Sequence, residues 1–220
     1  MRPLIAFTTL SFLLCATAHA DTVIEFKNQN QKSQFLTNGT MARLNTRGSD
    51  EYILVNFSNQ SIYTVSPEKK QITNISDALP SISGVQPQPI RLKLKPVGTG
   101  PAIAGYSTIK YRLSANGESC GAIFASKDAL KGTAVEDLFD TMKAMADNHL
   151  RSLGGFAALI PVCQMAKIEM ADKLQEVGVP MRTLDQEGRI ETEITMILKN
   201  AQVGAENYAF PLKYQTISMN

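Results

Sequence analysis

Two cysteines, Cys120 and Cys163, are the residues of this chain whose type and position predict a defined chemistry, the formation of a disulfide. The sequence contains three cysteines, Cys15, Cys120 and Cys163, and Cys15 lies in an N-terminal segment that we expect to be removed. An even pair of thiols in an oxidising compartment typically forms a disulfide. We therefore predict a Cys120–Cys163 bridge. It would close a loop of about 43 residues and stabilise the fold by roughly 4 kcal/mol in the chain-entropy model.

A reactive thiol is the alternative for Cys163. A helix that begins at Pro161 places Cys163 in its first turn, where the helix dipole lowers the pKa of a thiol. Neighbouring residues supply no partner base, so the disulfide is the favoured interpretation.

The remaining side chains argue against catalysis. His149 is the one histidine after residue 20, and it falls on the apolar stripe of a predicted helix, where packed histidines outnumber catalytic ones. No G-x-S-x-G motif presents a nucleophile, and one histidine with two paired cysteines does not supply a zinc site. Glu191 and Glu193 alternate with Ile190, Thr192 and Ile194, which is typical of a solvated strand face. We predict that the protein is not an enzyme and has no catalytic residue, metal or cofactor.

The first twenty residues have the three-part layout of a secretory signal peptide. Met1–Pro3 carries positive charge, Leu4–Leu14 is apolar, and Ala18–Ala20 has the small-x-small pattern of a cleavage site. The apolar run is shorter than the roughly 20 residues that span a bilayer. We predict a signal peptide over residues 1–20, cleavage between Ala20 and Asp21, and a soluble protein exported to the periplasm.

Removal of this segment leaves 21 basic against 20 acidic residues, because Arg2 is the one charged residue lost. A nucleic acid or an anionic membrane surface is normally met by a clustered basic excess. The balance of charges therefore predicts no nucleic-acid partner.

Strand patterns occupy both ends of the expected mature chain. From Asp21 to about Ser76, short alternating runs and polar turns predict an antiparallel meander. Further strands are predicted after residue 90 and from Met181 onwards, the last two at Tyr208–Leu212 and Tyr214–Met219.

Two helices are predicted between residues 133 and 178. The first begins at the capping box Thr133–Glu136 and ends at Gly154, and the second runs from Pro161 to Gly178. The second has an apolar stripe formed by Cys163, Ala166, Met170, Leu174 and Val177. Because Cys163 lies on that stripe, the disulfide would join this helix to the strand that carries Cys120.

Strands, a helical insertion and more strands in one chain predict an α+β fold. We expect one curved antiparallel sheet, an incomplete β-barrel, with a two-helix insertion at about 133–178 covering its concave face. Residues 21–220 would form a single domain.

Several short stretches are similar to an uncharacterised bacterial family. They are the meander from Gln34 to Ile75, Ile103-Ala104-Gly105-Tyr106 before a strand, Val179-Pro180-Met181-Arg182 after a helix, and Phe210-Pro211 near the end. The family that the chain resembles belongs with the periplasmic lipoprotein-carrier (LolA/LppX-like) superfamily. This resemblance implies a half-β-barrel whose open side is covered by helices and which encloses an apolar cavity for acyl chains.

The chain departs from this pattern in its long helical insertion and in the predicted disulfide. If the helices act as a lid, the disulfide limits how far the lid opens. This favours a fixed binder or a partner-docking module over a carrier that loads and unloads.

Two non-enzymatic functions follow. The first is lipid binding: a lipid or lipoprotein acyl chain held between sheet and helices, lined by Ile53, Val55, Phe57, Met142 and Met145. The adaptable methionine side chain suits variable acyl chains, although the same residues could fill a dry core. The second is a protein-interaction module that binds an envelope protein by strand addition at a sheet edge. A cavity of several hundred cubic ångströms would separate the two hypotheses.

Overall fold

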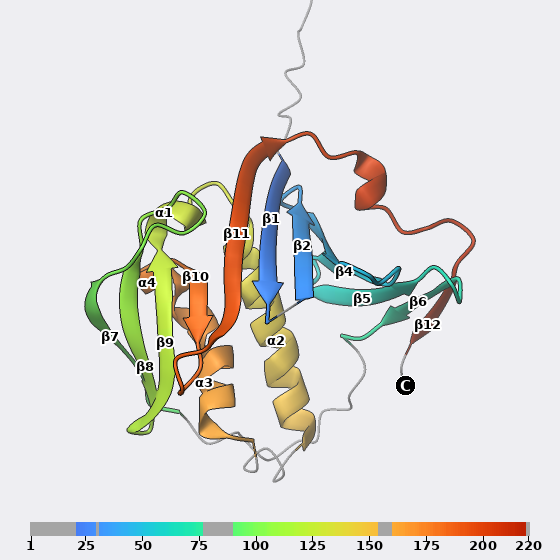
Figure 1. The fold of residues 1–220 in the computed structure, drawn as a ribbon. Coiled ribbons are helices and arrows are strands. Elements are labelled where there is room, and N and C mark those ends of the chain that lie inside the picture. Colours follow the sequence, from blue (N-terminus) through green and yellow to red (C-terminus); the bar gives the residue numbers. More distant parts are fainter. Residues whose placement is uncertain (1–20, 30, 77–89, 154–159, 219–220) are drawn as a thin grey trace, which may run out of the picture.

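One open sheet of twelve strands carries the fold, and the longer helices lie on one of its faces (Figure 1). The computed structural model describes residues 21–29, 31–76, 90–153 and 160–218. Residues 1–20, with Ala20 of the predicted cleavage site, lie outside the described residues. Among the described helices, none has the length and apolar character needed to cross a bilayer.

The elements follow one another along the chain as a long run of strands, a helical region and a final group of strands. The strands are β1 (Asp21–Asn28), β2 (Gln31–Thr37), β3 (Met41–Thr46), β4 (Tyr52–Asn56), β5 (Ser61–Ser66), β6 (Gln71–Asn74), β7 (Leu92–Thr99), β8 (Ile109–Ala115), β9 (Glu118–Ser126), β10 (Val179–Leu184), β11 (Ile190–Ala201) and β12 (Gln215–Ser218). The helices are α1 (Lys127–Leu130), α2 (Val135–Leu153), α3 (Val162–Glu169), η2 (Met170–Lys173), α4 (Leu174–Val177) and η3 (Ala205–Asn207).

The strand order is β12-β6-β5-β4-β3-β2-β1-β11-β10-β9-β8-β7. The predicted meander from Asp21 to Ser76 is confirmed, since β1 to β6 pair in sequence order. Alternation decides which face each side chain meets. Ile24 packs in the large core on the helix side, whereas Val23 packs on the outer face.

The predicted fold class, an α+β protein with an antiparallel sheet and a two-helix insertion, is wrong. The sheet is mixed, because β12 pairs with β6 in parallel. It is also not closed, since β12 and β7 stand at opposite ends of the strand order. Strands make up far more of the described chain than helices do. An alternating pattern identifies a strand but carries no information on its direction or its neighbour.

The helical region is more broken than predicted. The expected second helix is divided into α3, the 3-10 turn η2 and α4, and the short α1 precedes α2. The predicted stripe is nevertheless buried at Ala166, Met170, Leu174 and Val177. The apolar spacing therefore continues through the interruption of the helix and gives no sign of it. Gly178 ends α4 with φ +90°, and a Cβ there would lie 2.3 Å from the Ser126 carbonyl carbon. This position requires glycine.

The predicted strand over Tyr208–Leu212 is also wrong. That stretch follows η3 and forms turns, as residues 202–214 carry the chain across the outer face from β11 to β12. The stretch resembles a strand in the sequence because its aromatic residues are spaced to pack against the sheet, although the backbone forms turns. Tyr208 is buried against Val23 and Leu36, and the Phe210 ring meets Tyr63 edge-on at 4.8 Å between ring centres.

Candidate functional site

A largely apolar chamber of about 450 Å³ lies between the sheet and α2. Its walls come from β1 to β5, β10 and β11 on one side and from α2 on the other. The lining residues are Ile24, Phe26, Phe35, Leu44, Ile53, Val55, Ile62, Ile75, Val135, Leu138, Phe139, Met142, Met145, Val179, Pro180, Thr192 and Ile194. Thr192 is the one residue among them with a polar side chain. Such a volume lies within the roughly 300–1,000 Å³ of sites that hold small molecules.

Local periodicity places the side chains of this chamber. On β4, Ile53 and Val55 face it, while Leu54 between them is buried in a separate cluster on the outer face. On α2, apolar residues three and four positions apart form one stripe towards the sheet. Met142, on that stripe, is 49% exposed, so the chamber has an apolar residue that also meets solvent.

The structure brings together four of the five predicted lining residues. Ile53, Val55, Met142 and Met145 all line the chamber. Phe57 does not: β4 ends at Asn56, so Phe57 lies in the following turn, where it packs half-buried against the same core. Whether these residues bind a ligand stays a prediction.

The other lining residues were not identified from the sequence as part of the site, although their helical spacing and strand alternation can be seen in it. Val135, Leu138 and Phe139 have the same helical spacing as the two methionines. Phe35 and Ile194 belong to alternating strands far apart in the sequence, and both strands pair with β1. Sequence spacing alone could not show that these faces meet.

A second cavity of about 370 Å³ adjoins the chamber. Phe139, Pro180 and Thr192 line both spaces. Away from them, the second cavity extends beneath α3 to Met170 and Lys167 and across to Cys120. It therefore joins the apolar chamber to the region of the disulfide.

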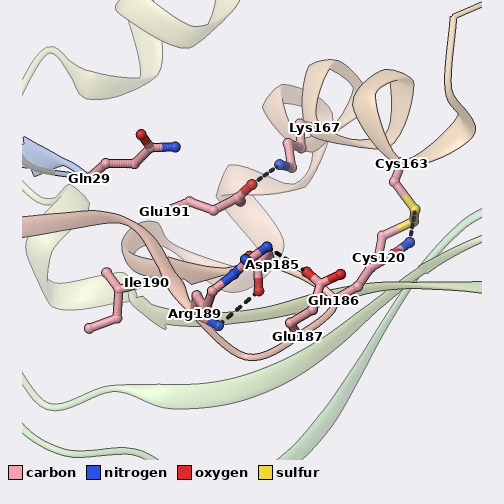
Figure 2. Close-up of a pocket in the computed structure, with 10 residues that line it drawn as sticks. All are labelled: Gln29, Cys120, Cys163, Lys167, Asp185, Gln186, Glu187, Arg189, Ile190 and Glu191. Atoms are coloured by element: carbon pink, nitrogen blue, oxygen red, sulfur yellow. Dashed lines mark hydrogen bonds and ion pairs between the residues drawn. A yellow bond between two sulfur atoms is a disulfide. The ribbon is translucent and has the colours of Figure 1, made fainter.

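A third, polar pocket of about 550 Å³ opens next to this second cavity (Figure 2). Cys120, Lys167 and Glu191 line both spaces. The Lys167 Nζ on α3 lies 2.6 Å from Glu191 Oε1 on β11. In the turn between β10 and β11, the Arg189 guanidinium pairs with Asp185 at 2.6 Å and with Glu187 at 3.0 Å.

The predicted disulfide forms one wall of the polar pocket and is confirmed. Cys120 on β9 and Cys163 on α3 are bonded, with 5.1 Å between their Cα atoms. The bond joins helix to strand over a core that includes Ala166 and Met170. The Gln186 amide donates to the Ser119 carbonyl at 2.8 Å and lies 3.3 Å from Cys163 Sγ. A bonded Cys163 is not the free reactive thiol of the alternative interpretation.

The acidic residues on β11 differ from their expected role. Glu191 and Glu193 are half-buried, and each has a cationic partner, Lys167 and Arg182 respectively. The interpretation of this face as simply solvated does not hold, because α3 and β10 supply cations that no local pattern indicated.

The described residues contain no group of three or more histidine, cysteine, aspartate or glutamate side chains placed to hold a metal ion. The backbone of His149 belongs to α2, while its side chain lies outside the part that the structure describes.

Comparison with known proteins adds little to this geometry. No family model matches the chain, and no curated protein matches it. The chain is similar to a solved structure described as the crystal structure of MucB, with a TM-score of 0.38 and 10% identity. The match covers 90% of this chain and 60% of that one, so it spans less than two thirds of MucB. A match this distant carries no functional argument, and the resemblance to the lipoprotein-carrier superfamily stays a prediction.

Proposed function

We propose that this protein is exported and binds a hydrophobic ligand, a lipid or acyl chain, in the chamber between the sheet and α2. The observation that carries this proposal is the chamber itself, about 450 Å³ with apolar walls. A fully packed core would leave no such space. Burial of each methylene contributes about 0.8 kcal/mol, so a chain of a dozen carbons provides a large driving force.

The disulfide supports the exported setting, because such bonds persist in oxidising compartments such as the periplasm. It also holds α3 against β9, which favours a binder of fixed shape. We propose a non-enzymatic role, in which the protein holds its ligand without transforming it.

The β7 edge of the sheet gives less support to an interaction module. β7 ends the strand order of the described residues, so one of its sides has no neighbouring strand, as strand addition would require. However, Pro96 removes an amide donor from this strand, and a register shift follows between Pro96 and Gly98. Prolines and bulges are devices that protect an edge from pairing.

A fluorescent fatty acid, cis-parinaric acid, tests the proposal. We expect binding at micromolar concentration and a loss of at least tenfold in affinity for Met142→Asp, because a carboxylate in an apolar site is costly to desolvate. Met142 is exposed enough to tolerate the change. Leu198→Asp is the matched control, since Leu198 is 50% exposed and does not line the chamber.

Thermal melting of each variant must accompany the binding assay. If stable wild-type protein binds no probe, or if Met142→Asp and Leu198→Asp bind it equally well, the chamber is not a ligand site.

A further inference from the structure

The apolar chamber belongs to a series of three spaces of increasing polarity. Phe139 and Thr192 stand between the first and second, and Lys167 and Glu191 between the second and third. The first space is lined almost wholly by apolar side chains, whereas five of the ten residues that line the third are charged (Figure 2). A ligand that follows this series must be apolar at one end and polar at the other.

The charges of the polar pocket indicate the kind of polar end. Its lining carries two cations, Lys167 and Arg189, and three carboxylates, from Asp185, Glu187 and Glu191. Each cation already has a carboxylate partner. An anionic head group would meet more negative than positive charge there. A zwitterionic head group could place its phosphate near Lys167 or Arg189 and its ammonium near the carboxylates.

The size of the chamber indicates the number of chains. At about 450 Å³ it lies near the lower end of the range for small-molecule sites, which suits one acyl chain better than two.

We infer that the polar pocket is the head-group subsite of the same ligand, and that this ligand is a single-chain zwitterionic phospholipid. The inference rests on the proposed function of the chamber. Lys167 and Glu191 stand where the hydrocarbon would give way to the head group. Their ion pair between α3 and β11 opens to admit the phosphate beside Lys167 and the ammonium beside Glu191.

Three lipids with the same 14-carbon chain separate head-group from chain recognition. They are myristoyl lysophosphatidylcholine, myristic acid and monomyristoylglycerol, each used below its micelle concentration to displace the fluorescent fatty acid. We expect lysophosphatidylcholine to bind about tenfold more tightly than either of the others.

Lys167→Met should weaken lysophosphatidylcholine about tenfold and change monomyristoylglycerol less than twofold, because the loss concerns only the phosphate. Lys173→Met is the matched control. Its side chain is 40% exposed against 46% for Lys167, and it also forms an ion pair, with Glu176, but does not line the pocket. Arg189→Gln, at a highly exposed position, provides a second variant if Lys167→Met does not fold.

The outcomes separate the two proposals. If all three lipids bind alike and Lys167→Met resembles wild type, the head-group subsite is overturned while the chamber stands. If myristic acid binds best and loses affinity in Lys167→Met, the head group is anionic and the inference is wrong. If no lipid displaces the probe from folded protein, both proposals are wrong: the polar pocket is not a head-group subsite and the chamber is not a lipid site.

Discussion

Lys143 on α2 and Glu169 on α3 face each other across the helix pair, with 3.7 Å between Nζ and Oε2. The same ammonium lies 3.0 Å from Asp147 and 3.8 Å from Asp172. Its side chain is only 18% exposed. Burial alone would lower the pKa of Lys143, but the hydrogen bond to Asp147 and the surrounding carboxylates raise it. One cation thus bridges carboxylates of α2, α3 and η2.

Lys143→Met should therefore loosen the helical layer. We expect the free energy of unfolding to fall by about 1–2 kcal/mol, since the pair is partly buried and its loss leaves carboxylates facing one another. Urea denaturation measures the change. Lys131→Met is the control, because the Lys131–Asp128 pair is highly exposed and solvent screening should leave it a much smaller contribution. Equal effects in the two variants would contradict a structural role for Lys143.

Asp140 and Asp128 should give opposite changes of stability with pH. Burial raises the pKa of Asp140, and the negative charges of Glu136, Asp137 and Asp172 add to the shift. The folded state then binds this proton more tightly than the unfolded state does. The protonated Asp140 carboxyl group therefore stabilises the folded state. This stabilisation is complete below the unfolded pKa of about 3.9 and is lost as pH rises through the folded pKa. Asp140→Asn should thus be more stable than wild type at pH 7, with the difference shrinking below about pH 4.

The hydrogen bond from Lys131, together with its charge, lowers the pKa of Asp128. The stabilising contribution of Asp128 is present above its unfolded pKa and is lost as pH falls through the folded pKa. Asp128→Asn should therefore be less stable than wild type at pH 7 and match it in acid. Thermal melts of both variants between pH 3 and 7 check the signs, and melts with the same sign would refute the assignment.

The disulfide should account for much of the stability of the fold. Replacement of both Cys120 and Cys163 by alanine should lower the free energy of unfolding by up to about 4 kcal/mol. Guanidinium denaturation measures it, and wild-type protein under reducing agent should unfold at a similar midpoint. Non-reducing peptide mapping of native protein should recover the two cysteine peptides linked. Recovery of both thiols freely alkylated would disprove the bond.

Export should produce a chain that begins at Asp21, because the signal pattern ends at Ala20. In the structure β1 begins at that residue, and the Asp21 carboxylate accepts a hydrogen bond from the Val203 amide at 2.9 Å. N-terminal sequencing of the exported protein checks the site. An uncleaved chain in the membrane fraction would show that the segment is retained.

Features set by local periodicity were predictable from the sequence, and features set by distant partners were not. The alternating runs from Asp21 to about Ser76 predicted the meander, and Met142 and Met145, predicted as lining residues, share one stripe of α2. The disulfide followed from cysteine count and compartment.

By contrast, the pairing of Lys167 on α3 with Glu191 on β11 joins a helix to a strand, and no spacing in the sequence reveals it. The parallel direction of β12 could not be predicted either, because it depends on pairing with β6, which is distant in the sequence. Phe57 has the strand parity of Val55, yet the turn after Asn56 takes it off the chamber wall.

Two neighbouring strands near the middle of the sheet, β1 and β11, lie far apart in the sequence. β1 pairs with β11, so that Thr22 lies opposite Lys199. The meander β1–β6 can form early, but one side of β1 has no neighbouring strand until β11, which ends at Ala201, pairs with it. Such non-local pairing slows folding, since a long loop must close before the contact forms. If the protein is exported as proposed, slow pairing of β1 with β11 would favour the unfolded form that translocation requires.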